Sequence, residues 1–209
     1  MKRSNLVAKT SWIAAGVLTA IISGPASAQW YAGAGVGSGK SSGINGTTTI
    51  GAVNVTTTGD ASRTSWKLLG GFQFTPNWGL EAQYTALGNR TITATAGATT
   101  GTGSASANQW SLAGTGTMPL SNGFSLMGKL GASRNQINGG NFCAGATCGN
   151  LGSSSRTDLL AGVGVGYSFN KNIGIRAEYE NFGKFSSNGG AGGNAIKADN
   201  WAISLIYSF

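Results

Sequence analysis

The ionisable side chains of this chain limit the chemistry that it can perform. Its 209 residues include 14 Lys and Arg, 6 Asp and Glu, and no His. Without His, a His-dependent general base, a His-based catalytic triad and a His-ligated metal site are all excluded. Glu81 and Glu178 could imitate a carboxylate pair for acid–base work, but basic residues on the same predicted face favour ion pairing. We therefore expect no enzyme, no cofactor and no metal site.

The first 28 residues have the pattern of an export signal. Lys2, Arg3 and Lys9 make a basic start, an apolar run covers Trp12 to Ile22, and small residues precede Ala28. This pattern predicts a secretory signal peptide of the Sec type over residues 1–28, with 29–209 as one mature domain. The alternative is a transmembrane anchor, but the run is about half the ~20 residues that span a bilayer.

The cysteines favour a disulfide over a metal site. Cys143 and Cys148 are the only two in the chain and lie close together among small and polar residues. An even pair at this spacing in an exported protein predicts a disulfide within a loop. A zinc site would lack ligands, because no His and no third Cys are available.

The mature chain alternates between apolar and polar residues with period two. Charged residues make up 10% of the chain, against about 25% in a typical soluble domain. Period-two alternation predicts β-strands, broken by polar stretches. We expect eight strands: Trp30–Gly39, Arg63–Phe74, Trp78–Leu87, Asn108–Met118, Phe124–Arg134, Arg156–Phe169, Ile173–Phe182 and Trp201–Phe209.

The connections alternate between short and long. Residues 75–77, 121–123 and 170–172 have tight-turn compositions, whereas residues 40–62, 88–107, 135–155 and 183–200 are long. An even strand number with this alternation is typical of an up-and-down transmembrane β-barrel, with the short turns in the periplasm. A soluble β-sandwich is the alternative, but it does not require strict alternation of loop length. Alternating β-branched residues at 47–50, 53–58 and 91–95 predict that strands continue beyond the membrane as hairpins.

The charged residues of the strands share one face. The large apolar and aromatic residues fix the outward face of each strand, and the charges fall on the other one. A charge that faces lipid near the midplane costs about 2–4 kcal/mol, whereas one in the lumen finds partners. We expect a lumenal ion-pair network of Arg63, Lys67, Glu81, Lys129, Asp158, Arg176, Glu178 and Glu180. Inward Gly162, Gly164 and Gly166 could leave water-filled space beside it.

Aromatic residues gather at both ends of the predicted strands. Such girdles mark the two membrane interfaces of transmembrane barrels. We assign Trp66, Trp110 and Trp201 to the outer girdle, and Trp30, Trp78 and Phe209 to the inner one.

Several short segments have a shared family pattern. They are Trp30-Tyr31-Ala32-Gly33-Ala34-Gly35, Gly70-Gly71-Phe72, Gly79-Leu80-Glu81-Ala82-Gln83-Tyr84, Arg176-Ala177-Glu178-Tyr179 and the alternating end Ile203, Leu205, Tyr207 and Phe209. Together they resemble the small OmpA-like outer-membrane β-barrel family of Gram-negative bacteria. The terminal alternation resembles the signal that the barrel-assembly machinery reads.

The resemblance implies an eight-stranded barrel without a periplasmic domain and with a polar, mostly filled interior. It also implies that Glu81 is the acidic gate residue, Lys129 a basic partner, and Arg176 with Glu178 a basic–acidic pair. Gly35 departs from the pattern, because family members often carry a lumenal Lys there, and Lys67 is its expected substitute.

Two kinds of function remain open from the sequence. The first is a structural or porin-like barrel whose polar lumen is closed or gated by ion pairs. The second is a surface interaction protein, adhesin-like or receptor-like, that binds an extracellular ligand through four Thr-, Gly- and Asn-rich loops. In both cases we expect a monomer in contact with outer-membrane lipid and lipopolysaccharide. The modest positive charge is not typical of nucleic-acid binding.

Overall fold

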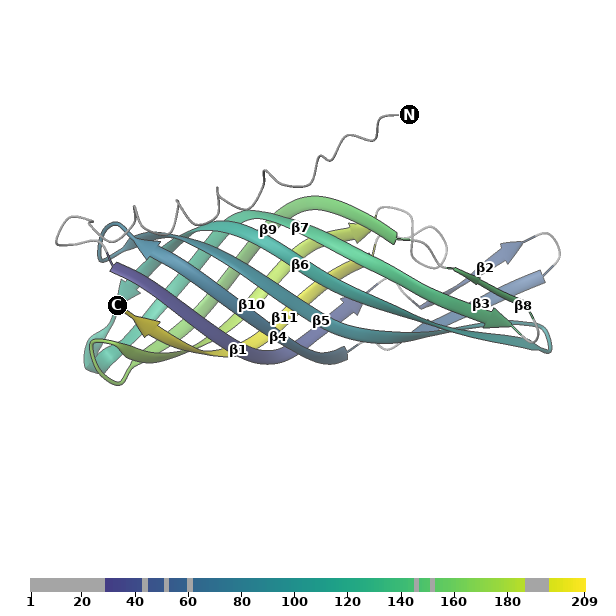
Figure 1. Ribbon diagram of the computed structural model, residues 1–209, viewed down its shortest axis with the longest axis horizontal. Coiled ribbons are helices and arrows are strands. Elements are labelled where there is room, and N and C mark those ends of the chain that lie inside the picture. Colours follow the sequence, from purple (N-terminus) through teal and green to yellow (C-terminus); the bar gives the residue numbers. More distant parts are fainter. Residues whose placement is uncertain are drawn as a thin grey trace, which may run out of the picture.

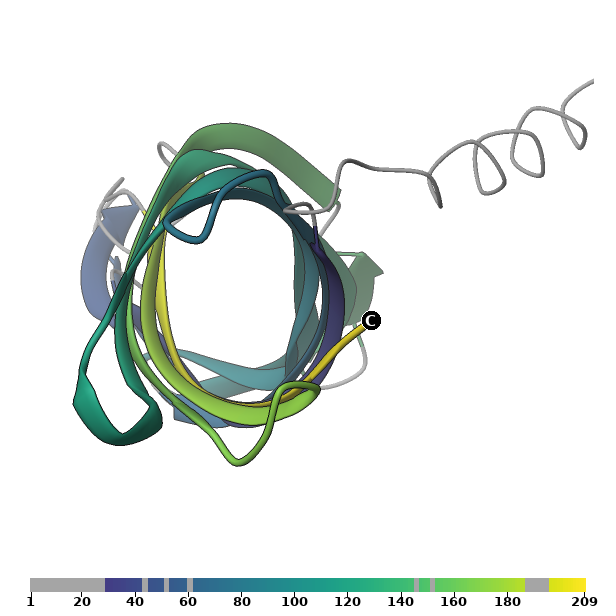
Figure 2. The same cartoon turned by 90° about the vertical axis from the view of Figure 1, so that its left-hand side faces the viewer.

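The computed structural model describes residues 29–42, 45–50, 53–59, 62–144, 147–150, 153–186 and 196–209. No helix within these ranges is long and apolar enough to cross a membrane. The chain forms eight long antiparallel strands: β1 (Gln29–Ser42), β4 (Ser62–Gln73), β5 (Trp78–Ala96), β6 (Thr99–Pro119), β7 (Phe124–Ala144), β9 (Ser153–Ser168), β10 (Ile173–Ser186) and β11 (Ile196–Ser208). Because β1 pairs with both β4 and β11, the sheet closes into a barrel, which Figure 2 shows end-on. The signal peptide predicted over 1–28 lies outside the described residues.

Three tight turns join strands at one end of the barrel, called the turn end here. Side chains shape these turns: Thr75 Oγ1 accepts from the backbone N–H of Trp78 at 3.0 Å, and Asn170 Oδ1 accepts from that of Ile173 at 2.8 Å. The third is the 3₁₀ turn η1 (Ser121–Gly123), in which Asn122 has a φ of 59°. Asn tolerates this left-handed conformation better than most residues, as the turn composition predicted.

The opposite end, called the loop end, extends far beyond the predicted strands (Figure 1). The predicted connection over 88–107 is mostly strand, because β5 and β6 continue to a turn at Gly97, with a bulge near Gly88. The hairpin β2 (Gly46–Ile50) and β3 (Val53–Gly59) pairs onto β5, and β8 (Thr147–Asn150) pairs with β7. The predicted extension of the strands as hairpins, at residues 47–50, 53–58 and 91–95, is therefore confirmed, and the second connection is paired over more of its length than residues 91–95.

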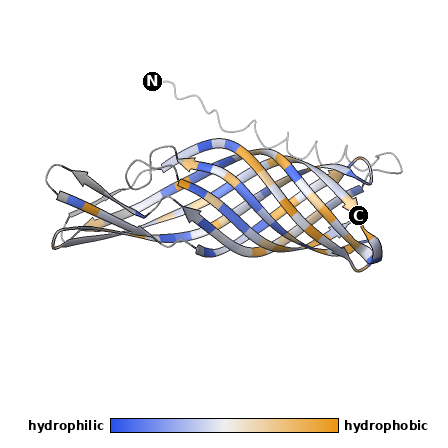
Figure 3. Cartoon of the chain, turned by 180° about the vertical axis from the view of Figure 1, so that it is seen from behind, coloured by the Kyte–Doolittle hydropathy of each residue, from blue (hydrophilic) through white to orange (hydrophobic). Residues whose placement is uncertain are grey.

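The outer wall of the barrel is apolar. Figure 3 shows hydrophobic residues mainly on the part of the barrel that carries the C-terminus. The rings of Trp66, Tyr84 and Trp110 contact one another across β4, β5 and β6, with centroids 5.4 and 4.6 Å apart. Phe124 and Tyr167 meet at 4.8 Å near the turn end. The predicted girdle residues Trp66, Trp78, Trp110, Trp201 and Phe209 are all exposed on this wall, and Trp30 is half-buried against Phe72.

The inward residues change character along each strand. On β10, going from the turn end, the buried residues are Arg176, Glu178, Glu180 and Phe182, followed by Phe185 beyond a bulge. On β5 the order is Glu81, Gln83, Thr85 and Leu87. Charged, polar and apolar layers therefore follow one another inside the barrel, with the apolar layer nearest the loop end.

Candidate functional site in the barrel interior

Six charged side chains from four strands meet in the lumen and form what we call the charged cluster. Lys67 comes from β4, Glu81 from β5 and Lys129 from β7, and β10 supplies three more. All six are between 0 and 8% exposed. The members are Lys67, Glu81, Lys129, Arg176, Glu178 and Glu180. The charged cluster has three positive and three negative charges, which is the balance that burial away from water requires.

Lys129 is the centre of the charged cluster. Its Nζ lies 2.7 Å from Glu81 Oε1, 2.7 Å from Glu178 Oε1 and 2.8 Å from Glu180 Oε1. It also donates to Gln83 Oε1 at 3.1 Å. One ammonium group thus holds three carboxylates that would otherwise repel one another.

Arg176 and Lys67 supply the other two positive charges that neutralise the carboxylates of the charged cluster. Arg176 Nη2 donates to Glu81 Oε2 at 2.6 Å, and its Nε lies 3.3 Å from Glu178 Oε2. Lys67 Nζ pairs with Glu178 and, at 3.2 Å, with Glu180 Oε2. Lys67 was expected to take the place of the family lysine that is absent at Gly35. Lys67 lies directly opposite Gly35 on β1, so its side chain extends from the neighbouring strand at the same level.

Two of the eight predicted network residues lie outside the charged cluster. Arg63 has the inward parity but is exposed at the loop end of β4. Asp158 lies on the loop-end rim, where its carboxylate is 3.6 Å from Arg156 Nε and accepts from the backbone N–H groups of Leu159 and Lys184 at 2.8 and 3.0 Å. These backbone donors hold the pKa of Asp158 below its usual range. The prediction was wrong for both, because parity gives the face of a residue but not its depth.

Each member of the charged cluster lies directly opposite a glycine on a neighbouring strand. Lys129 and Glu180 both face Gly162, and Glu178 faces Gly164. The remaining pairs are Lys67 with Gly35, Glu81 with Gly71, and Arg176 with Gly166. A Cβ at Gly162 would lie 2.9 Å from Lys129 Cγ, and one at Gly164 would lie 2.9 Å from Glu178 Cγ. These two glycines therefore make room for long side chains, so the predicted water-filled space is wrong at Gly162 and Gly164, whereas Gly166 lines an open pocket near the turn end.

Tyr31 is a further inward residue of the site. Its hydroxyl donates to Glu81 Oε2 at 3.0 Å, and its ring lies beneath the Arg176 guanidinium, 5.9 Å away. A Cβ at Gly71 would lie 2.2 Å from this ring, so the glycine is needed to seat it. Tyr31 is inward by the same parity that puts Trp30 outward, and that parity was the signal available in the sequence.

An apolar layer closes the lumen on the loop-end side of the charged cluster. Leu87, Leu160, Phe182 and Phe185 are almost completely buried and pack together with Ala113 and Ala198. We call this set the apolar plug. The carbonyl of Phe182 accepts from Ser133 Oγ at 3.0 Å and from Asn135 Nδ2 at 2.7 Å, which fixes the β10 backbone at the plug. The alternation of the sequence predicts that Leu87 and Leu160 face inward, but it does not predict their contact with Phe185.

The cysteines are in the β7–β8 hairpin at the loop end. Cys143 lies directly opposite Cys148 in the ladder, and Cys143 is disulfide-bonded. The pair lies outside the charged cluster and the apolar plug.

The comparisons with known proteins agree with this architecture. The family model described as outer membrane protein beta-barrel domain matches residues 13–209. The chain belongs to this family. It is accordingly a protein of the bacterial outer membrane with a closed, eight-stranded, OmpA-like barrel. No curated protein matches the chain.

Solved structures of small outer-membrane barrels are similar in fold. OprG from Pseudomonas aeruginosa is 14% identical, with a TM-score of 0.54 over 88% of this chain and 96% of that one. Neisserial surface protein A is 14% identical, with a TM-score of 0.53 over 86% and 97%. At this identity the likeness concerns the fold alone.

Proposed function

We propose that this protein is a structural or porin-like barrel whose lumen is closed in its resting state. The observation that carries this proposal is the stacking of two layers, the charged cluster and the apolar plug, across one narrow lumen. An eight-stranded barrel is only wide enough for its side chains to fill. Passage of an ion would require Lys129 to release its carboxylates and also the apolar plug to separate.

Single-channel recording of the refolded barrel in a planar bilayer tests this proposal. We expect the native barrel not to conduct, and single variants that weaken one layer to conduct rarely. A double variant, Glu81→Gln with Phe182→Ala, weakens both layers and should give brief openings. Gly70→Ala is the matched control, because a Cβ there would meet only the Tyr31 carbonyl at 3.9 Å. Steady conductance of the native barrel would contradict closure.

A surface interaction role is the second candidate, and the length of the outer hairpins supports it. Hairpin β2–β3, the extended β5–β6 hairpin and β8 form a stranded platform beyond the barrel wall (Figure 1). Thr47 and Thr56 hydroxyls lie 3.2 Å apart across β2–β3, and both can meet solvent. Exchanging residues 88–107 for a short turn, followed by a cell-surface binding assay, separates the two candidates. Binding that survives this exchange and that of residues 45–59 would exclude the platform as ligand-binding surface.

We infer that the barrel contacts lipopolysaccharide through outward lysines at the loop end. Lys184 lies directly opposite Lys197, and Lys197 directly opposite Ser42. Lys40 lies directly opposite Asp199, so Lys184 and Lys197 are the lysine pair without an acidic residue between them in the ladder. Like charges directly opposite each other are destabilising. A lipid phosphate between Lys184 and Lys197 would offset this repulsion. Trp201, exposed four residues after Lys197, puts these lysines at the level of lipid phosphates. We expect Lys197→Gln to reduce the stabilisation that lipopolysaccharide gives relative to phospholipid, and Lys171→Gln at the turn end to leave it unchanged.

The remaining expectations concern export and assembly. We propose cleavage after Ala28, with residues 29–209 forming a monomeric barrel domain, and recognition of Ile203, Leu205, Tyr207 and Phe209 by the barrel-assembly machinery. All four side chains of the terminal segment point outward or lie at the chain end, where a partner strand can reach them. N-terminal sequencing of the mature protein and an outer-membrane assembly assay of Phe209→Ala test these points.

A further inference from the structure

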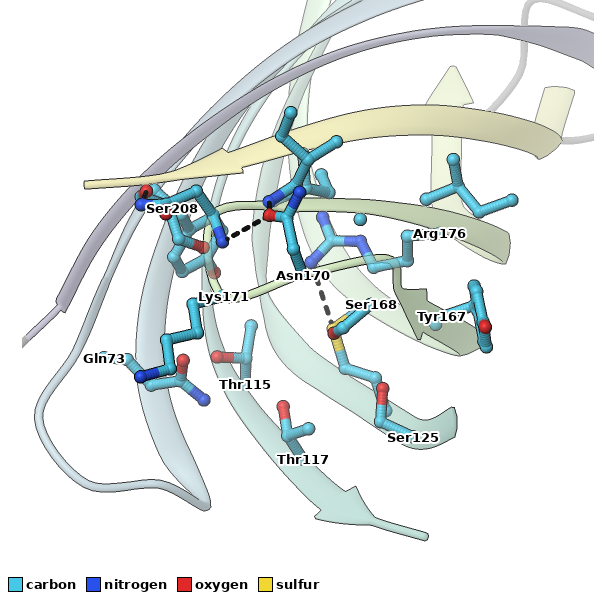
Figure 4. A pocket seen from close by; sticks show the side chains of 18 residues that line it. Gln73, Thr115, Thr117, Ser125, Tyr167, Ser168, Asn170, Lys171, Arg176 and Ser208 are labelled. Atoms are coloured by element: carbon cyan, nitrogen blue, oxygen red, sulfur yellow. Dashed lines mark hydrogen bonds between the residues drawn. The ribbon is translucent and has the colours of Figure 1, made fainter. Parts of the chain in front are cut away.

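The turn end of the lumen contains a pocket of about 170 Å³ beneath the charged cluster. Its wall comes from β1, β4, β6, β7, β9, β10 and β11, and the turn that contains Lys171 lies at its mouth (Figure 4). The charged cluster and the apolar plug separate this pocket from the loop end. A solute therefore reaches the pocket only from the turn end, which faces the periplasm in barrels of this kind.

The lining of the pocket is hydroxyl-rich and electropositive. Hydroxyl groups come from Thr115, Thr117, Ser125, Ser168 and Ser208. The lining includes two cationic side chains, Arg176 at the inner end and Lys171 at the mouth, and no acidic one. The carboxylate partner of Arg176, Glu81, is not among the lining residues. Because Arg176 belongs to the neutral charged cluster, the net positive charge of the lining comes from Lys171 at the mouth.

Arg176 has donor capacity that its protein contacts leave unused. The residue is 8% exposed, and Nη2 donates to Glu81. Nη1 donates to Met127 Sδ at 3.2 Å, as the dashed line in Figure 4 shows, and a thioether is only a weak acceptor. Nε has no well-aligned acceptor within the part of the chain that the structure describes, although Glu178 Oε2 is 3.3 Å away. Because Nη2 and Nε face carboxylates, Nη1 is the guanidinium nitrogen without a strong acceptor. Such a buried donor favours an oxyanion, because charged acceptors form its strongest hydrogen bonds.

We propose that this pocket binds a small oxyanion, a carboxylate or phosphate group of a periplasmic solute. Arg176 Nη1 donates to the oxyanion in place of the Met127 contact, and the hydroxyls of Thr115 and Ser125 supply further donors. Lys171 adds a second positive charge at the mouth. The small volume restricts the ligand to the anionic group and a few attached atoms. This site is independent of whether the barrel conducts.

Calorimetric titration of the refolded native barrel tests the proposal at constant low ionic strength. The probes are inorganic phosphate and acetate, with chloride as the reference anion, so that the two oxyanion types are distinguished. The main variant is Lys171→Glu, a change in an exposed turn that leaves the barrel wall intact. Its matched control is Arg134→Glu, a charge reversal at an exposed position near the loop end. Lys197→Glu is measured separately, because it reports anion binding at the loop-end lysines. Arg176→Lys is the second variant, with folding checked by circular dichroism.

We expect saturable binding of phosphate or acetate to the native barrel and to Arg134→Glu. Lys171→Glu should weaken it at least fivefold, and a folded Arg176→Lys at least tenfold, because lysine cannot reproduce the planar guanidinium donors. Absence of saturable binding of both probes would overturn the proposal. So would binding that Lys171→Glu leaves intact, or binding that is lost in Lys197→Glu instead, since the anion would then be at the loop-end lysines.

Discussion

Replacing Lys129 by Met should strongly destabilise the barrel. The Lys129 ammonium contacts three buried carboxylates at 2.7 to 2.8 Å, and its stem fills the space over Gly162. Methionine preserves most of the stem but removes the charge, which leaves three buried carboxylates with two cations. Removing one partner of a buried ion pair costs about 3–5 kcal/mol. We expect the free energy of unfolding of Lys129→Met to fall by about that amount.

The assay is equilibrium unfolding by urea in lipid vesicles, followed by tryptophan fluorescence. The double variant Lys129→Met with Glu180→Gln restores a neutral cluster of two cations and two carboxylates. It should recover much of the loss, so that the two changes are not additive. Lys40→Met, at an exposed position, is the control and should change the free energy of unfolding by less than about 0.5 kcal/mol. A loss below about 1 kcal/mol for Lys129→Met, or additivity in the double variant, would refute the role of Lys129 as the centre of the cluster.

Three further changes probe the packing around the site. Gly71→Ala should lower the free energy of unfolding by about 1–3 kcal/mol, because its Cβ would lie 2.2 Å from the Tyr31 ring, whereas Gly70→Ala on the opposite face should be nearly neutral; urea unfolding compares the two. Phe182→Ala should cost about 3–5 kcal/mol by opening a cavity in the apolar plug, and an unchanged unfolding midpoint would exclude a packed plug. Cys143→Ser should increase proteolysis of the β7–β8 hairpin while the barrel keeps its folded mobility in electrophoresis; loss of that mobility would show that the disulfide holds the barrel itself.

The strand number and the faces of the strands could be predicted from the sequence because side chains alternate with period two. That rule put Lys67, Glu81 and Lys129 on the inward face correctly. It also put Arg63 and Asp158 inward, although they lie at the loop-end rim. The depth of a residue in a barrel depends on strand tilt and on where each strand begins, and neither is encoded in the alternation.

The strand ends at the loop end were predicted only in part. The β-branched residues at 91–95 indicated that β5 continues, but the pairing of the Gly-, Ser- and Thr-rich residues 99–106 with β5 depends on the backbone partners that each strand supplies to the other. The composition of such a segment suggests a flexible loop. A hydrogen-bond ladder between two strands nevertheless continues until one of the strands contains a residue that interrupts it.

By itself, the sequence determined a closed, eight-stranded, membrane-facing barrel with charges inside, because an apolar outer face and satisfied backbone groups are obligatory in lipid. Only the tertiary structure decided how the interior is filled. Register put each charged side chain opposite a glycine, brought Lys129 between three carboxylates, and joined Leu87, Leu160 and Phe185 into one apolar plug. Lys129 is 48 positions from Glu81 and 51 from Glu180 along the chain, so only the folded barrel sets the distances between these side chains.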